Sequence, residues 1–252
     1  MIKAAAIQHD IVWEDPKANF VRMAPRLADA ANQGARLAVV SEMWSTGFSM
    51  KSDRIAEPSD GPTTTFMLQQ ADRHGIWIAG SVPIKQASGG LPLNRFVLAG
   101  PGGITHVYDK IHPFSMAGEH EHYAAGTRVV TVEIDGVRIT PLICYDLRFA
   151  DLFWTAAANT DCFVVPANWP DARRWHWISL LRGRAIENQA YVIGVNRVGD
   201  AGRLSYTGDT RVIDPMGNEN SAALGVEETV FAEIDPDFVA STRRDFPFMV
   251  DR

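Results

Sequence analysis

The sequence predicts an α/β protein whose sheets carry helices on their outer faces. Short apolar runs such as Ile2–Gln8 and Leu37–Val40 are typical of buried strands. They alternate with longer segments in which apolar residues recur at helical spacing. Two such strand–helix–strand alternations occur, separated by a run of strands. Isolated buried strands between helices favour sheets that are covered by helices.

The composition is that of an ordinary globular protein. The chain has 252 residues, of which 46% are hydrophobic and 21% are charged, which excludes disorder, collagen and coiled coil as the main structure. No long linker, low-complexity tract or fixed repeat interrupts it, so we expect residues 1–252 to form a single domain. The formal net charge of −6 argues against a general nucleic-acid binder, which needs a dense basic face.

The sequence also gives an expectation for location. No apolar stretch approaches the roughly 20 residues of a membrane span, and the N-terminal segment turns polar after Ile7, too soon for a signal peptide. The two cysteines, Cys144 and Cys162, lie in apolar runs, whereas a secreted scaffold would carry more. We therefore expect no membrane contact and a reducing, cytoplasmic setting.

The first half of the chain contains clear helix signals. Asp15 is a typical cap and Pro16 a typical first helical residue, while Pro25 is expected to bend this helix or make its first part irregular. The predicted elements are helices from Pro16 to about residue 33 and at Thr63–His74, strands at Ile2–Gln8, Leu37–Val40, Ile76–Val82, Arg95–Ala99 and Ile104–Tyr108, and a long loop at Lys110–Gly126.

The second half begins with a hairpin signal. The pair Asp135 and Gly136 is typical of a tight turn between two strands. The segment after Asp237 is predicted to be irregular. The predicted elements are strands at Arg128–Ile134, Val137–Ile143, Cys162–Pro166, Tyr191–Asn196 and Thr229–Ile234, helices at Phe149–Ala158 and Trp175–Gln189, and a hairpin at Thr210–Asp214.

Glu42, Lys110 and Cys144 each come at or just after the end of an apolar strand. Ligand sites in helix-covered sheets gather beyond the carboxyl ends of strands. A carboxylate can take the proton of a thiol, the thiolate can attack a carbonyl, and an ammonium stabilises the oxyanion. The backbone N–H of Tyr145 is a natural second oxyanion donor. Each residue alone is more often a surface or core residue, so the joint pattern carries this prediction.

Several segments carry a resemblance to a known family. They are LAVVSEMWSTGF, YDKIHPFSMAGEHEHYAAG, LICYDLRF, ANWP and RAIENQAYVIGVNRVG. They resemble the nitrilase superfamily of carbon–nitrogen hydrolases, and within it the omega-amidase branch, over nearly the whole chain. The resemblance implies a four-layer α-β-β-α sandwich of two mixed sheets. It also implies cysteine-dependent hydrolysis of an amide or nitrile, with no metal and no organic cofactor.

Carried over residue by residue, the resemblance implies Glu42 as the general base, Lys110 as the catalytic lysine and Cys144 as the nucleophile. The family has a second glutamate in the loop after the lysine, where both Glu119 and Glu121 lie. Glu119 is preferred because it precedes a glycine, residue 126, by seven residues, as in related sequences. Glu121 is the alternative. The expected reaction releases ammonia through a thioester acyl-enzyme.

The resemblance also implies a small amide with a carboxylate at its far end, such as 2-oxoglutaramate or 2-oxosuccinamate. Because an arginine fork matches a carboxylate, Arg173 is the candidate partner, although a solvated charge is the commoner role for such a residue. Phe114 and Trp169 are candidates for the walls of a small pocket. Arg148 is interpreted as structural, paired with an acid such as Asp146 or one further away.

Other interpretations remain open. Glu119–His122, with His112 and His176, offers ligands for zinc and hence a metal-dependent hydrolase, although no convincing further ligands appear at other strand ends. Nitrile hydrolysis, carbamoyl hydrolysis and acyl transfer differ from amide hydrolysis in the pocket, which motifs barely record. A binding module that keeps the fold without catalysis is the remaining alternative.

The resemblance implies at least a dimer. The last segment, Pro236–Arg252, is rather apolar for a free end. Its large apolar residues are Phe238, Phe246, Phe248 and Met249. We expect the tail from about residue 237 to 252 to pack against a partner subunit.

Overall fold

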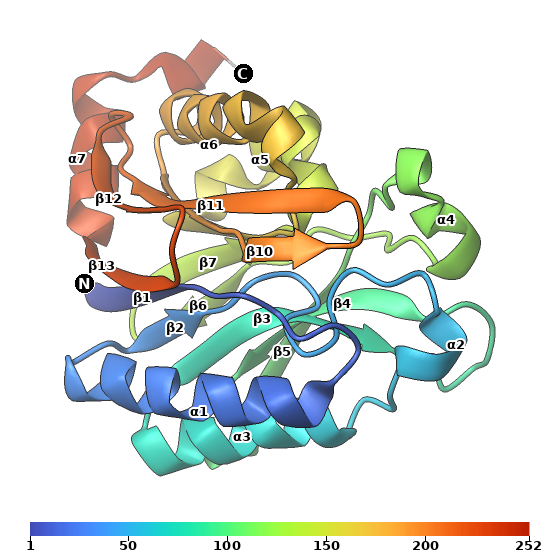
Figure 1. Cartoon of the computed structure of the whole chain (residues 1–252). Helices are drawn as coiled ribbons and strands as arrows, with labels where there is room; N and C mark the ends of the chain where they lie inside the picture. The colour runs from blue at the N-terminus through green and yellow to red at the C-terminus, as the bar shows by residue number, and fades with distance from the viewer. Residues whose placement is uncertain (252) are drawn as a thin grey trace.

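Two mixed β-sheets lie face to face (Figure 1). The computed structural model describes residues 1–251. The first sheet has six strands in the order β13-β1-β2-β3-β4-β5, and the second has seven, in the order β10-β11-β9-β8-β7-β6 with β12 paired to β11. The strands are β1 Ile2–Gln8, β2 Leu37–Val39, β3 Trp77–Ile84, β4 Leu93–Ala99, β5 Thr105–Asp109, β6 Val132–Ile134, β7 Val137–Pro141, β8 Cys162–Pro166, β9 Tyr191–Val195, β10 Val198–Ala201, β11 Leu204–Ile213, β12 Glu219–Leu224 and β13 Glu228–Ile234.

Helices cover the outer face of each sheet. In Figure 1, α1 and α3 lie below the first sheet, and α5 and α6 lie above the second. The helices are α1 Pro16–Asn32, α2 Ser52–Ile55, α3 Pro62–His74, α4 Glu119–His122, α5 Ala150–Ala156, α6 Arg174–Asn188 and α7 Pro236–Asp245, with short 3-10 helices η1 Pro101–Gly103, η2 Ser115–Ala117, η3 Cys144–Arg148, η4 Ala157–Asn159, η5 Asp171–Arg173 and η6 Phe248–Asp251. The predicted four-layer α-β-β-α sandwich is therefore confirmed.

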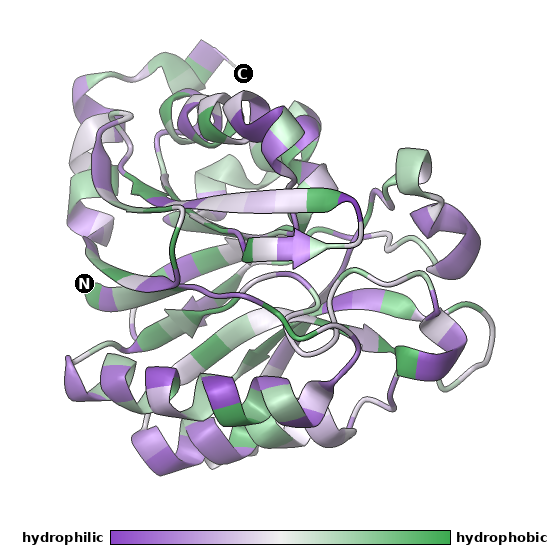
Figure 2. Ribbon diagram, in the orientation of Figure 1, coloured by the Kyte–Doolittle hydropathy of each residue, from purple (hydrophilic) through white to green (hydrophobic). Residues whose placement is uncertain are grey.

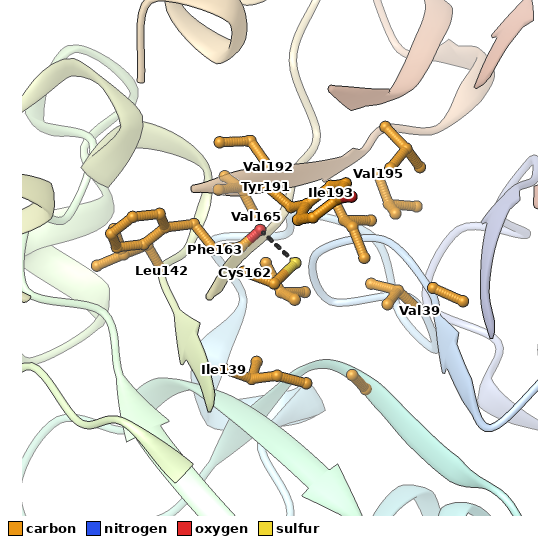
Figure 3. Close-up of a cluster of buried hydrophobic side chains, with 14 of the residues drawn as sticks. Val39, Ile139, Leu142, Cys162, Phe163, Val165, Tyr191, Val192, Ile193 and Val195 are labelled. Carbon is orange, nitrogen blue, oxygen red and sulfur yellow. Dashed lines mark hydrogen bonds between the residues drawn. The ribbon is translucent and has the colours of Figure 1, made fainter. Parts of the chain in front are cut away.

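Strand alternation separates the layers. Along β2, the side chains of Leu37 and Val39 pack in the core between the two sheets. The side chain of Ala38 packs in the core between the first sheet and helices α1 and α3. Figure 3 shows Val39 of the first sheet in one cluster with Ile139 of the second. The inner strands are mostly hydrophobic and the outer helices carry hydrophilic residues on their exposed sides (Figure 2). Within residues 1–251, none of the helices has the length and apolar character that a membrane crossing requires.

Strand directions bring four carboxyl ends together in pairs. β2 runs parallel to β3, and β5 has the same direction because β3, β4 and β5 pair antiparallel in turn. β7 and β8 are parallel neighbours in the second sheet. The carboxyl ends of β2 and β5 therefore lie at one edge of the first sheet, and those of β7 and β8 lie at one edge of the second.

Helix α1 continues through Pro25. The helix runs from residue 16 to residue 32 without a break, so the irregular first part is not present. Pro25 has no N–H to donate to the carbonyl oxygen of Val21, one turn earlier. Both residues lie on the exposed face of the helix, where water can satisfy that oxygen.

The end of the chain is helical where the sequence analysis predicts an irregular tail. Helix α7 begins at Pro236, and Asp235 caps it by accepting a hydrogen bond from the Asp237 N–H at 3.0 Å. This Asp-Pro start signal is the same as that of α1. The prediction of an irregular tail is therefore wrong, although the sequence holds the signal that corrects it.

The hairpin predicted at Thr210–Asp214 is also wrong. Strand β11 continues through this segment, and the turn follows Asp214. The Oδ1 atom of Asp214 accepts hydrogen bonds from the N–H groups of Met216 at 2.8 Å and Asn218 at 2.9 Å, so the turn begins at this aspartate. Of the strand predicted at Arg128–Ile134, only the end is confirmed, as β6, and the loop predicted after residue 110 contains η2 and α4.

Candidate active site

Glu42, Lys110 and Cys144 lie just beyond the ends of β2, β5 and β7. All three are buried, with exposed fractions of 0%, 1% and 8%. Glu119, the first residue of α4, is fully buried beside them, whereas the side chain of Glu121 is 70% exposed. The structure thus brings the four candidate residues together, and of the two loop glutamates only Glu119 contacts the lysine.

Lys110 is the centre of this cluster. Its Nζ lies 2.8 Å from Glu42 Oε1, 2.8 Å from Glu119 Oε2 and 3.1 Å from Glu119 Oε1. An ammonium has three N–H donors, so each of them has a carboxylate oxygen as its partner. Burial by itself lowers the pKa of Lys110, but the Glu119 and Glu42 carboxylates outweigh burial and raise the pKa above its usual value. The lysine therefore remains charged.

Two buried asparagines also bind these carboxylates. The Nδ2 of Asn94 donates to Glu42 Oε1 at 2.8 Å and to Glu119 Oε1 at 3.0 Å. The Asn168 N–H donates to Glu42 Oε2 at 2.9 Å. Neither asparagine is among the predicted site residues. Asn168 lies in the ANWP segment of the resemblance, which could have identified it, whereas Asn94 belongs to no motif.

Glu119 has a full set of hydrogen-bond donors. The Phe114 N–H donates to its Oε2 in addition to the contacts from Lys110 and Asn94. Burial raises the pKa of Glu119, Lys110 opposes that rise, and the nearby Glu42 carboxylate adds to it. The helix α4 thus holds a carboxylate whose oxygens are fully engaged with the cluster.

Cys144 is the first residue of η3, and its backbone is strained. Its φ of 45° lies in the left-handed region, which residues other than glycine rarely adopt and which is common at functional sites. Burial raises the pKa of the thiol well above its usual value, with Glu42 adding to the rise and Lys110 opposing it. The resting sulfur is therefore a neutral thiol, which needs a base to become a nucleophile.

Asp146 fixes this turn to the segment that carries the lysine. Its Oδ2 accepts hydrogen bonds from the Tyr108 hydroxyl at 2.8 Å and the Ile143 N–H at 3.0 Å. Its Oδ1 accepts a hydrogen bond from the His112 N–H at 2.9 Å. Because these donors flank both the nucleophile and the lysine, one buried carboxylate sets their separation.

A cleft of about 470 Å³, including its open mouth, has Cys144 in its wall. The residues predicted as substrate contacts, Phe114, Trp169 and Arg173, all line this cleft. So does Arg148, while none of the lining residues within the described part of the chain is acidic. The cleft is therefore largely aromatic and aliphatic, with a positive charge.

Arg148 faces this cleft. Its guanidinium lies over the Trp169 ring at 4.7 Å, and its Nη2 is 3.2 Å from the Nδ1 of His176. Asp146, the predicted partner of Arg148, is engaged by other donors, and no carboxylate within residues 1–251 forms an ion pair with this arginine. The prediction of a structural ion pair is therefore wrong. Arg173 lies 5.5 Å from the centre of the Phe114 ring.

Cys162 has different surroundings from Cys144. It lies in β8, fully buried in the core between the sheets near Val39 and Ile139 (Figure 3). Its Sγ contacts the main-chain oxygen of Phe163 at 3.6 Å, and burial raises the pKa of its thiol. Both cysteines are free thiols. Cys162 is therefore a small residue of the core.

The His-rich loop does not assemble a metal site in the described structure. Among residues 1–251, no three His, Cys, Asp or Glu side chains are grouped so that they could hold a metal ion. The side chains of His120 and Glu121 are 52% and 70% exposed. His112 stacks on Phe149 with ring centres 3.5 Å apart, and His176 contacts an arginine.

Comparison with known proteins gives the family. The model of the family described as Carbon-nitrogen hydrolase matches residues 3–244. Omega-amidase YafV of Escherichia coli K12 is 41% identical over 99% of this chain and 96% of its own length, and 2-oxoglutaramate amidase of Bacillus subtilis 168 is 31% identical over 98% and 96%. The structure of XC1258 from Xanthomonas campestris, a CN-hydrolase superfamily protein with an arsenic adduct in its active site, matches with a TM-score of 0.93 at 37% identity over 100% of this chain and 97% of that chain. The chain is therefore a carbon–nitrogen hydrolase and belongs to the omega-amidase branch of the nitrilase superfamily.

Proposed function

We propose that this chain is an omega-amidase that releases ammonia from a small amide with a carboxylate at its far end, such as 2-oxoglutaramate or 2-oxosuccinamate. The observation that carries the proposal is the charge of the cleft. Arg148 and Arg173 line it together with Cys144, and no acidic residue in the described lining balances them. A guanidinium can bind a carboxylate through two parallel hydrogen bonds. The Escherichia coli relative is an omega-amidase and the Bacillus subtilis relative is a 2-oxoglutaramate amidase, which agrees with this substrate class.

In the proposed acylation, Glu42 takes the proton of Cys144 as the sulfur attacks the amide carbon. The raised pKa of the thiol requires such a base. The Tyr145 N–H, at the start of η3, donates to the oxyanion that forms. Because its N–H donors are held by carboxylates, Lys110 acts mainly through its positive charge. Glu119 keeps that charge in place.

In the proposed deacylation, the proton on Glu42 first passes to the leaving ammonia, which leaves an acyl thioester on Cys144. Water then attacks the thioester with Glu42 again as the base. The carbon–sulfur bond breaks, the sulfur recovers its proton and the free carboxylic acid leaves. These steps use side chains of the chain itself and call for no metal and no organic cofactor.

The substrate is proposed to bind with its carboxylate toward the arginines. Phe114 and Trp169 then flank the short carbon chain, since both line the cleft beside Arg173 and Arg148. Apolar walls with a few charged groups are typical of small-molecule sites. The reacting amide of a short substrate can lie against Cys144 while its carboxylate contacts a guanidinium.

The decisive experiment is ammonia release by Cys144→Ala. We expect the rate to fall by at least about 10³-fold, because the covalent step is lost. Cys162→Ala is the matched control, and we expect it to keep its turnover per folded molecule. Native ammonia release by Cys144→Ala would end the proposal.

A substrate panel tests the substrate class and the alternative reactions. We expect acidic amides to give a higher kcat/KM than neutral amides of equal length. Nitriles, carbamoyl compounds and an added amine acceptor in the same panel measure the alternatives of the superfamily. We expect exhaustive chelation to leave the activity unchanged and a thiol alkylator to abolish it. The opposite pattern would indicate a metal-dependent hydrolase.

We further propose that the protein is a cytoplasmic homodimer. The two free cysteines fit a reducing setting. The tail residues Phe246 and Phe248 are 54% and 47% exposed and line one hollow with Ile186 and Met216, which makes a contiguous apolar patch. A second subunit would cover them.

A further inference from the structure

Asn94 is a buried residue of β4 that joins both carboxylates of the site. Its Nδ2 donates one hydrogen bond to Glu42 at 2.8 Å and one to Glu119 at 3.0 Å. Its main-chain oxygen accepts a hydrogen bond from the Lys110 N–H at 3.0 Å. An amide nitrogen has two hydrogens, so each carboxylate receives one of them. The strand register thus places one neutral donor beside all three charged groups.

The other end of the Asn94 amide shows why it is oriented this way. Its Oδ1 is buried and has no hydrogen-bond partner within residues 1–251. A buried amide oxygen without a partner is unfavourable, yet the reversed amide would place that oxygen against Glu42 and Glu119. Ionised carboxylates can only accept hydrogen bonds. The orientation observed is therefore the one that favours two ionised carboxylates.

The acceptor positions of the two carboxylates are unequally filled. Glu119 receives two donors on each oxygen, from Lys110, Asn94 and the Phe114 N–H. Glu42 Oε1 receives two donors, from Lys110 and Asn94, whereas Oε2 receives one, from the Asn168 N–H. A carboxylate has about four acceptor positions. The open position therefore lies on Glu42 Oε2.

This open position is on the side of the nucleophile. Asn168, whose N–H binds Glu42 Oε2, lines the same cleft as Cys144, so this oxygen lies on the side of Glu42 that faces the nucleophile. A proton that leaves the thiol therefore has an available acceptor at Oε2, whereas Oε1 and both oxygens of Glu119 are already engaged.

We propose that Asn94 is a positioning residue, which by donating to both carboxylates restricts proton uptake to the Oε2 atom of Glu42. This inference rests on the proposed function, in which Glu42 is the base. The sulfur–hydrogen bond of Cys144 breaks, the proton binds Oε2, and the electron pair of the sulfur forms the bond to the amide carbon. The same proton later passes from Oε2 to the leaving ammonia.

The pH dependence of the reaction reports on this arrangement. The charged or titratable groups that act on Glu42 are Lys110, Glu119, Cys144, Tyr123 and Tyr206. Burial raises the pKa of Tyr206 to about 12, and burial also raises that of Tyr123. Burial raises the pKa of Glu119, so protonation of this carboxylate contributes to the acid limb of kcat/KM. Asn94 donates to both carboxylates, so losing it makes proton uptake easier and moves that limb to higher pH.

The experiment measures kcat and KM against pH for wild type and Asn94→Leu. Leucine has a similar volume and no donor. We expect the acid limb of kcat/KM to move to higher pH by about one unit. A shift of that size corresponds to the free energy that a hydrogen bond to a charged group usually contributes. KM should change little, because Asn94 is not in the cleft wall. Asn188→Leu is the control, since Asn188 is equally buried and donates to the Arg184 main-chain oxygen. Its acid limb should not move.

An unmoved acid limb in folded Asn94→Leu overturns the inference, and so does a variant that stays inactive at alkaline pH. If Asn94→Leu does not fold, Asn94→Asp replaces it. An ionised aspartate cannot donate a hydrogen bond, so the acid limb of this variant must also move to higher pH. An unmoved acid limb in Asn94→Asp would likewise overturn the inference. Failure of the proposed function can be told apart from failure of this inference. In the former case, the Cys144→Ala substitution would not reduce ammonia release.

Discussion

Arg148 and Arg173 differ in how firmly their guanidinium groups are held. Arg148 lies over the Trp169 ring at 4.7 Å and contacts the His176 Nδ1 at 3.2 Å. The Arg173 guanidinium lies over the Phe114 ring at 5.5 Å and has no hydrogen bond to another described side chain. A group that is already oriented loses less conformational freedom when a ligand binds. Arg148 should therefore contribute more to binding of a substrate carboxylate.

This difference gives a prediction for two matched variants. Arg148→Met should raise KM for an acidic amide by about 10- to 100-fold, the usual worth of a charge-assisted hydrogen bond, and Arg173→Met should raise it less. KM for a neutral amide of equal length should change little in either variant. Ammonia release at varied substrate concentration measures both. An equal rise for acidic and neutral amides would show that the arginines only shape the cleft.

The site residues that the sequence predicts are those that follow a strand or lie in a motif. Glu42, Lys110 and Cys144 each follow a strand, so they could be found before the sheets were known. Asn94 could not, because its role comes from the pairing of β4 beside Lys110 rather than from its own neighbours. For Arg148 the sequence predicts an ion pair, because it does not show the direction in which η3 turns after the nucleophile.

The ends of β1 and β2 are joined by a buried histidine. The Nδ1 of His9 lies 3.1 Å from the Asp10 main-chain oxygen, which can only accept, so Nδ1 carries the hydrogen. Its Nε2 then accepts from the Ser41 hydroxyl at 3.0 Å, next to Glu42. Burial lowers the pKa of His9 from 6.5 to about 4. The two strands are therefore joined by a neutral imidazole.

This contact predicts a loss of stability in acid. In the unfolded chain His9 gains a proton near pH 6.5, whereas in the folded protein it does so only near pH 4. The stabilisation it provides is thus complete above pH 6.5 and lost as the pH falls toward 4, by about 3 kcal/mol in total. Urea unfolding of wild type and His9→Gln at pH 7 and pH 4 measures it.

We expect the variant to be less stable at pH 7 but to lose about 3 kcal/mol less than wild type between the two pH values. His120→Gln is the control, because the His120 side chain is 52% exposed. An equal loss in wild type and His9→Gln would contradict the assignment of the acid sensitivity to His9.

Helices and strands agree with the sequence-based predictions where the apolar pattern or the capping residues are clear. Strand β8 has the predicted bounds, and the helix that begins at Pro16 has its predicted cap. Helix α7 is short and buries only Val239 and Thr242, so its apolar pattern is brief, although Asp235 and Pro236 mark its start. Strands β10 and β12 are short and each has only one buried residue, so they carry too little apolar pattern to be predicted.

At the scale of the whole molecule, an apolar hollow joins α6 to the tail. Its exposed apolar side chains are Ile186, Met216, Phe246 and Phe248, which are 45%, 46%, 54% and 47% exposed. They come from α6, the turn after β11, and the segment after α7. Because parts of the chain distant in sequence build one apolar surface, the hollow fits contact with a second copy better than a local packing defect.

The last prediction therefore concerns assembly. We expect wild type to sediment as a dimer or larger assembly at micromolar concentration, since a stable interface of standard size buries about 1,200–2,000 Å² and needs an apolar centre. The double variant Phe246→Ser and Phe248→Ser should shift the equilibrium toward monomer without lowering the free energy of unfolding of the subunit. Val21→Ser, on the exposed face of α1 at 76% exposure, is the control and should sediment like wild type. A monomeric wild type at these concentrations, or a double variant that stays fully associated, would exclude this surface as the interface.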